Sequence, residues 1–336
     1  MRRPVCVLGL GLIGGSLVRA AAAAGRRVWG ATTSAEDARA ARAEGYDVVA
    51  STEEAVARAG VEDALVVLAV PLPAVEPVLR EIASVAPECR LTDVVSVKEP
   101  VADAVRRLLP RARYVGGHPM AGTSASGWAA GDAALFRDAA WVVTAEVTES
   151  DEEDDEDEAG AEGDPGLWAE VARLALDCGA RVVPATPAEH DAAVARVSHL
   201  PHVLAAVLAA VGADGGPLAL SLGAGSFRDG TRVMGTRPEL VRAMCEGNRW
   251  ALLDAVDDAL GRLGAARGAL ASTGSLAATV AAGHAARRSW ERLRSADAGS
   301  RVRVNSHDLR CLVELGRHGG RVVALDDDEA VVALPE

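Results

Sequence analysis

The first residues whose spacing suggests chemistry are three glycines near the amino terminus. Gly9, Gly11 and Gly14 form a G-x-G-x-x-G motif between an apolar segment at 5–8 and a helical pattern that begins near Ser16. Glycines at these positions permit a tight turn, close approach of the backbone to a phosphate and close packing of helix on strand, while the helix start offers amide donors. The motif alone is weak, but its strand-turn-helix context predicts dinucleotide binding.

The residues expected to contact the cofactor's ribose depart from the usual pattern. NAD-binding sheets commonly carry an acid at the end of the second strand, about 20 residues after the glycines. This chain has Thr32, Thr33 and Ser34 there, and Arg39 stands one turn into the next helical pattern. Because hydroxyls can bond either a 2′-hydroxyl or a 2′-phosphate, NAD+ and NADP+ both stay open. The predicted cofactor-binding set is Gly9, Gly11, Leu12, Ile13, Gly14, Thr32, Thr33, Ser34 and Val70.

A histidine follows a later predicted strand in a frame of glycines and proline. The segment at 116–123 reads G-G-H-P-M-A-G-T, and D-V-V-S-V-K at 93–98 ends an earlier strand. Ligands of an open parallel sheet bind beyond the carboxyl ends of its strands, and imidazole has an unperturbed pKa near neutrality. We therefore predict that His118 is a general base beside the nicotinamide and that Ser96 orients it. The alternative is a loop histidine bonded to backbone.

Further histidines open the C-terminal half. His190 and Asp191 precede the sequence S-H-L-P-H at 198–202. No Cys or Glu completes a ligand set, so we predict no metal site. His199 is equally well explained as a buried helix residue, whereas His202 and Ser198 are four residues apart and share a helix face.

An arginine and an aspartate stand close together in D-G-T-R at 229–232. Arginine suits a carboxylate because its planar fork donates two parallel hydrogen bonds, and Asp229 is placed to hold the fork of Arg232. The alternative for the pair is a surface salt bridge.

Short β-branched segments alternate with alanine-rich helical segments up to about residue 186, which predicts a parallel sheet covered on both faces. After Pro187 the strands disappear and helical patterns follow at 189–212, 238–247 and 249–271. The segment 203–211 is apolar nearly all round, which predicts a helix buried on every side, as in a subunit interface.

The predicted strands are 5–8, 27–31, 64–70, 90–94, 114–116, 140–144 and 180–184. The predicted domains are a dinucleotide-binding α/β domain at 1–186 with an acidic loop at 146–166, an all-helical substrate and dimerisation domain at 187–295, and a small α+β appendix (β-α-β-β) at 300–336.

Composition narrows the class of protein. The net charge is −13, but Glu149 to Glu158 holds nine acids and no base, so the acidity is local and indicates a solvated loop. Nothing basic enough to bind nucleic acid remains. The five cysteines are scattered without a C-x-x-C, which favours a reducing, cytoplasmic location. The uninterrupted apolar segment 203–213 is shorter than the ~20 residues of a membrane span, so we expect none.

Five motifs together, in order and at compatible spacing, resemble the prephenate and arogenate dehydrogenase family from residue 4 to about residue 270. They are G-L-G-L-I-G-G-S at 9–16, D-V-V-S-V-K at 93–98, G-G-H-P-M-A-G-T at 116–123, S-H-L-P-H at 198–202 and D-G-T-R at 229–232. The resemblance implies a Rossmann domain and a helical dimerisation domain, hence a homodimer. It also implies oxidative decarboxylation of prephenate to 4-hydroxyphenylpyruvate with NAD+ or NADP+, in tyrosine biosynthesis. Arogenate is the alternative substrate.

The resemblance also implies roles for individual residues. His118 would take the proton from the ring hydroxyl of the substrate, with Ser96 as its hydrogen-bonding partner. Arg232, braced by Asp229, would bind the ring carboxylate. The remaining residues of the implied substrate site are His202 and Gly225, facing the side chain, and His190, Asp191, Ser198 and Thr123 around them.

Departures from the family leave some points open. Some members carry an acid where this chain has Ser124, so an ionic gate built on that acid is absent, and the choice of substrate and feedback by tyrosine stay undecided. A competing 3-hydroxyacid dehydrogenase would rely on a lysine in its helical domain, and no lysine follows Lys98. A non-catalytic NADP-sensing protein would not need His118, Ser96 and Arg232 together.

Overall fold

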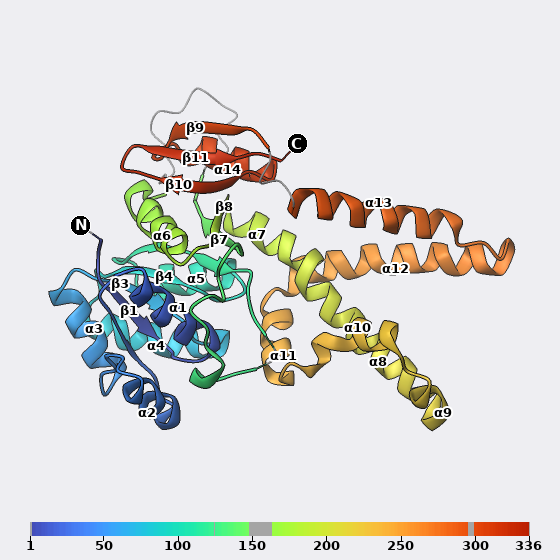
Figure 1. Cartoon of the computed structure of the whole chain (residues 1–336), viewed down its shortest axis with the longest axis horizontal. Coiled ribbons are helices and arrows are strands. Elements are labelled where there is room, and N and C mark those ends of the chain that lie inside the picture. Colours follow the sequence, from blue (N-terminus) through green and yellow to red (C-terminus); the bar gives the residue numbers. More distant parts are fainter. Residues whose placement is uncertain (1, 124, 148–162, 295–298, 336) are drawn as a thin grey trace. The chain divides into compact units, whose positions relative to one another are not determined.

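The computed structural model describes residues 2–123, 125–147, 163–294 and 299–335, in two compact units (Figure 1). The first contains the chain up to His190 together with 302–332, and the second contains 191–301 and the last residues. Ser124 and the acidic run from Glu149 to Glu158 lie outside the described residues.

The first sheet has five parallel strands in the order β2-β1-β3-β4-β5. β1 and β3 are completely buried and consist of apolar residues, half of them valine, as strands covered on both faces require. The chain runs from β1 to β2 on one side and then to β3 on the other, which makes a topological switch point between β1 and β3. The strands are β1 (Val5–Leu8), β2 (Val28–Ala31), β3 (Leu65–Leu68), β4 (Arg90–Asp93) and β5 (Arg113–Val115); the helices among them are α1 (Leu12–Ala23), α2 (Ala35–Ala43), α3 (Thr52–Val61), α4 (Leu72–Val85) and α5 (Glu99–Leu108).

The second sheet has six strands in the order β6-β7-β8-β10-β11-β9. β6 is antiparallel to β7, β7 is parallel to β8, and β10 pairs antiparallel with β8. Its elements are β6 (Gly117–Pro119), β7 (Ala140–Thr144), β8 (Arg181–Ala185), β9 (Arg301–Asn305), β10 (Arg321–Leu325) and β11 (Glu329–Ala333), with the 3-10 turn Trp128–Ala130 and the helices α6 (Pro165–Asp177) and α14 (Leu309–Arg317).

This second sheet changes two expectations. Periodicity predicted one parallel sheet up to residue 186, but the strands after β5 belong to a separate mixed sheet. The β-α-β-β pattern at 300–336 is confirmed, yet it completes this sheet, because β8 would otherwise present an unpaired edge. His118 lies within β6, paired opposite Val142, and so is held by a strand rather than by a loop.

The second unit is all helical, which together with the first sheet confirms the predicted fold class. α7 continues through a π-helical turn into α8, and α10 packs on α8, where Gly212 and Gly223 leave room for the Phe227 ring. The elements are α7 (Pro187–Val194), the π turn Ala195–His199, α8 (Leu200–Asp214), α9 (Gly216–Ser221), α10 (Gly225–Thr231), the 3-10 turn Arg232–Gly235, α11 (Pro238–Gly247), α12 (Arg249–Ser272) and α13 (Ala277–Arg294).

The apolar segment of α8 is not buried within one chain, so the prediction of a helix buried on every side is wrong for the single chain. Leu204, Val207, Leu208 and Val211 are 43% to 63% exposed. The continuous helix from Pro187 to Asp214 is also long and apolar enough to cross a membrane, judged by length and composition only, although the uninterrupted apolar segment predicted no span. One such helix is weak evidence for a membrane, and an apolar face of this kind equally suits a protein partner.

Candidate active site

The predicted glycine turn lies at the switch point between β1 and β3. Gly9 has a φ of +101°, and a Cβ there would lie 2.4 Å from the Ala69 carbonyl oxygen and 3.0 Å from Val70 Cγ1. A Cβ on Gly14 would lie 1.9 Å from the Gly9 carbonyl oxygen. Both positions therefore require glycine for the turn itself. The turn also places Val70, another predicted cofactor contact, directly against Gly9.

Gly11 has a different environment. A Cβ on it would meet no atom within 4 Å. It is the N-cap residue of α1, no side chain caps this helix, and no acid lies in its first turn. The open space and the uncapped, half-buried helix start form a cradle that fits a pyrophosphate, which needs backbone amides and close approach.

The predicted ribose contacts are partly engaged in local structure at the end of β2. The Ser34 amide donates to Thr32 Oγ1 at 3.3 Å, and Ser34 Oγ accepts from the Asp37 amide at 3.2 Å, capping α2. Thr33 is exposed. The three residues thus form a hydroxyl-lined turn that suits either nicotinamide dinucleotide.

His118 forms a buried pair with His190. His118 Nδ1 lies 2.8 Å from His190 Nε2, and the two rings meet edge to face at 72°. Their exposed fractions are 8% and 2%. The sequence placed His190 only around the substrate, whereas the structure makes it a direct partner of the predicted base. Ser96, the partner that the sequence predicted, lies half-buried in the turn between β4 and α5.

The start of α7, which carries His190, is anchored within the first unit. Thr186 and Glu189 form a capping box: the Thr186 amide donates to Glu189 Oε2 at 2.9 Å and the Glu189 amide donates to Thr186 Oγ1 at 3.2 Å. Arg317 of α14 also bonds the Glu189 carboxylate. Burial raises the pKa of Glu189, but these hydrogen bonds outweigh it and the net shift is downward. The C-terminal segment thus helps to fix the helix that presents His190.

In the second unit the polar residues gather around the π turn, a feature often found at functional sites. His199 is fully buried, its Nδ1 lies 3.1 Å from the Asn248 amide nitrogen, and the same amide donates to the Asp191 carbonyl at 2.7 Å. These contacts support a structural role for His199. His202 Nδ1 donates to the Ser198 carbonyl at 2.8 Å, which leaves Nε2 as the acceptor in the neutral ring.

The predicted brace between Asp229 and Arg232 is not observed in the part of the chain that the structure describes. Asp229 instead pairs with Arg228, its neighbour, at 3.3 Å, and both side chains are largely exposed. Arg232 is exposed at the start of the 3-10 turn, and Gly225 opens α10. In the first unit, Thr123 is exposed, and its Oγ1 accepts from the Ala125 amide at 3.2 Å. Across the described ranges, no three His, Cys, Asp or Glu side chains gather in a way that could hold a metal ion.

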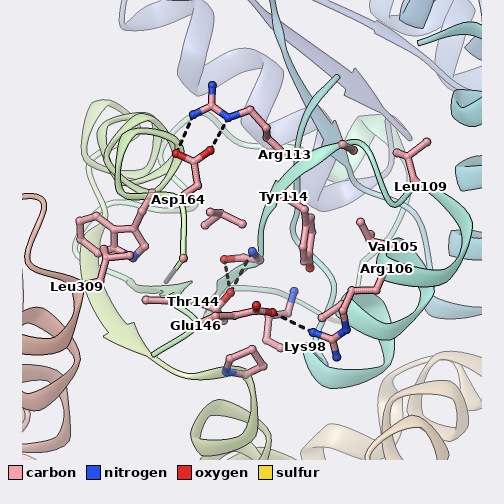
Figure 2. Close-up of a pocket in the computed structure, with 18 of the residues that line it drawn as sticks. Lys98, Val105, Arg106, Leu109, Arg113, Tyr114, Thr144, Glu146, Asp164 and Leu309 are labelled. Atoms are coloured by element: carbon pink, nitrogen blue, oxygen red, sulfur yellow. Dashed lines mark hydrogen bonds and ion pairs between the residues drawn. The ribbon is translucent and has the colours of Figure 1, made fainter. Parts of the chain in front are cut away.

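A pocket of about 380 Å³ lies elsewhere in the first unit, between α5, β5 and α6 (Figure 2). Ion pairs Arg113–Asp164 and Arg106–Glu146 lie at its sides. Lys98 lines it, but His118 and the glycine turn do not. This pocket is therefore separate from the predicted cofactor site and from the predicted base. Lys98 lines the pocket and also lies near His118, since it bonds the Gly117 carbonyl.

Comparisons with known proteins agree with this arrangement. Residues 17–156 match the family described as prephenate dehydrogenase, nucleotide-binding domain, and residues 186–275 match its dimerization domain. Over 266 residues the chain is 32% identical to the prephenate dehydrogenase of Bacillus subtilis, covering 77% of this chain and 67% of the relative.

Solved structures show the same likeness. A candidate prephenate dehydrogenase of Corynebacterium glutamicum is 48% identical, with a TM-score of 0.79 over 86% of this chain and 89% of that one. The arogenate dehydrogenase of Synechocystis is 28% identical, with a TM-score of 0.69 over 85% and 99% of the two chains. The two units, their motifs and these matches together identify the chain as a member of the prephenate dehydrogenase family.

Proposed function

We propose that this chain catalyses the oxidative decarboxylation of prephenate to 4-hydroxyphenylpyruvate with NAD+ or NADP+. The observation that carries the proposal is the buried His118, held by His190, in the same unit as a glycine turn with open space at Gly11. Arogenate is the second candidate substrate, because the likeness extends to an arogenate dehydrogenase. It differs from prephenate by an amino group in place of the side-chain keto group.

The proposed chemistry assigns one proton transfer to the protein. A bound nicotinamide supplies the hydride acceptor, with the turn at Gly9, Gly11 and Gly14 holding its pyrophosphate. His118 accepts the proton of the ring hydroxyl, and loss of carbon dioxide yields an aromatic ring, so the reaction runs strongly forward. Because Nδ1 of His118 faces His190, Nε2 is the nitrogen that takes the substrate proton.

The pair with His190 also favours the charged product of that step. With Nε2 as the base, neutral His118 carries its proton on Nδ1 and already donates to His190 Nε2 across 2.8 Å, and this hydrogen bond becomes charge-assisted when His118 becomes imidazolium. A hydrogen bond to the charged form of a group stabilises that form. His190 therefore strengthens His118 as a base and fixes the plane of its ring.

The remaining site residues bind the substrate in this proposal. Arg232 binds the ring carboxylate, and Ser96 orients the base and the ring hydroxyl. Asp229 belongs to the same D-G-T-R segment as Arg232, His202 and Gly225 face the substrate side chain, and the residues around them are Ser198, Thr123, His190 and Asp191.

We further propose a cytoplasmic homodimer in which the exposed face of α8 is the interface. The helical unit matches a dimerization domain, and the exposed residues Leu204, Val207, Leu208 and Val211 require cover from water. The five cysteines are free thiols, which suits a reducing compartment. Light scattering should give twice the mass of one chain, and Val207→Asp should shift it towards the monomer. A wild-type monomer would contradict the dimer.

Steady-state rates with prephenate and arogenate, each paired with NAD+ and NADP+, test the reaction. His118→Asn should lower kcat by roughly two to four powers of ten, the usual scale for loss of a general base, with KM for substrate nearly unchanged. A variant with the wild-type kcat would remove His118 from this role.

A further inference from the structure

Lys98 is the only lysine in the chain, although lysine and arginine together number 35. Arginine supplies every other cationic side chain of these two types. The Lys98 side chain is 1% exposed. An isolated buried ammonium would lose its charge, so a lysine retained at such a position needs a buried partner.

That partner is Asp93, the last residue of β4. Lys98 Nζ bonds Asp93 Oδ1 and also donates to the Gly117 carbonyl oxygen at 2.6 Å. The Asp93 carboxylate is fully buried and accepts from the Val95 amide at 2.8 Å and from the Tyr114 hydroxyl at 2.6 Å. The Gly117 amide points at Asp93 Oδ2 from 3.4 Å. The ion pair therefore engages both backbone polar groups of Gly117.

Gly117 immediately precedes His118 on β6. A Cβ on Gly117 would lie 2.7 Å from the Asp93 carbonyl oxygen, so β6 packs directly against the end of β4. Ser96 lies in the short turn that the Asp93–Lys98 contact closes. One buried ion pair thus fixes the backbone next to His118 and the turn that carries Ser96. These are the two residues that the proposed function places at the substrate's ring hydroxyl.

We propose that Asp93 and Lys98 are positioning residues: their ion pair holds His118 and Ser96 in register with the bound substrate and cofactor. The proposal rests on the proposed role of His118. Lysine suits the position because a compact ammonium can donate to two closely placed oxygens, whereas the planar guanidinium of arginine needs a wider site. Tyr114, which bonds the same carboxylate, supports the pair from the side of the pocket in Figure 2.

The test separates positioning from stability with three variants. Lys98→Met and Asp93→Asn each leave an unmatched buried group, so both should lower the melting temperature and lower kcat about 100-fold, the scale of a 1 Å misplacement. The double variant removes both charges, so the melting temperature should recover. Its kcat should stay low, because the Gly117 backbone has still lost its contacts with the ion pair. KM for substrate should stay within about twofold.

A matched control comes from a second buried ion pair in the same unit. Arg26 Nε bonds Asp177 Oδ2 at 2.7 Å and its side chain is 2% exposed. Arg26→Met should lower the melting temperature without changing kcat at temperatures where the protein is folded. Tyr114→Phe, which keeps both charges, should lower kcat about tenfold with little change in melting temperature.

Because the chain has one lysine, 15N-lysine labelling offers a readout that does not depend on activity. The folded protein should show one side-chain ammonium signal that exchanges slowly with water at neutral pH, and Asp93→Asn should abolish it. A fast-exchanging signal in the wild type would overturn the buried ion pair. A double variant with wild-type kcat, alongside an inactive His118→Asn, would overturn the positioning role alone, whereas an active His118→Asn would show that the proposed function had failed.

Discussion

Replacing Gly11 by alanine should separate cofactor binding from folding. The φ of −73° at Gly11 is accessible to alanine, and the added Cβ would meet no atom within 4 Å. The folding cost is the exchange of glycine for alanine at an N-cap, about 0.5–1 kcal/mol. The added methyl would, however, stand where a pyrophosphate approaches the first-turn amides of α1.

The expected loss of affinity is about 100-fold, or about 2.7 kcal/mol. Thermal unfolding with cofactor makes the loss visible. At a cofactor concentration of about 100 times the wild-type Kd, binding stabilises the wild type by about 2.7 kcal/mol and the variant by only about 0.4 kcal/mol. Calorimetric titration with NAD+ and NADP+ gives the two Kd values directly.

Gly14→Ala is the matched control, because its Cβ would lie 1.9 Å from the Gly9 carbonyl oxygen. Such overlap cannot relax without moving α1, so this variant should lose about 1–3 kcal/mol of stability before any cofactor is added. If Gly11→Ala bound both dinucleotides with wild-type Kd, the space at Gly11 would not be the pyrophosphate site.

Three further changes test other parts of the molecule. Arg232→Ala should raise KM for substrate at least tenfold, because hydrogen bonds to a charged group contribute about 1.5–3 kcal/mol, and an unaltered KM would mean that the carboxylate binds elsewhere. Deleting 149–158 should leave kcat and KM intact, and an inactive deletion variant would show that the acidic run is needed for catalysis. Burial raises the pKa of the Cys6 and Cys178 thiols to about 12. As the pH rises, each thiol therefore ionises at a lower pH in the unfolded chain than in the folded one. The free energy of unfolding should fall by about 1.4 kcal/mol per pH unit per thiol between pH 9 and 12. Alanine at both positions should flatten this slope, as measured by denaturation at alkaline pH.

Features set by local spacing could be predicted from the sequence. The glycine turn needs only a few consecutive residues, and the structure confirms it as strand β1, turn and helix α1. The change from short β-branched segments to long helical patterns after Pro187 likewise predicted the two kinds of architecture. Backbone sterics and side-chain periodicity act over a few residues, so both can be read along the chain.

Contacts between distant residues depended on tertiary structure. The partner of His118 is 72 positions away in the sequence, and no periodicity links the two imidazoles. The strands of 300–336 were predicted, but the pairing of β10 with β8 was not. The sequence of a strand shows that it can join a sheet, but it does not show which strand will lie beside it. The exposed face of α8 shows the same limit, since an apolar helix is compatible with burial by its own chain or by another.

Residue types along the chain therefore determined the cofactor class, the proposed base and the order of strands and helices, since each follows from local geometry and chemistry. Only the tertiary structure decided which groups surround the base. Asp93 and Lys98 are five residues apart, but Gly117 and Tyr114, which bond this buried pair, come from β6 and β5, and His118 meets His190 only when β6 and α7 come together. These buried polar side chains are retained because such partners arrive from other segments.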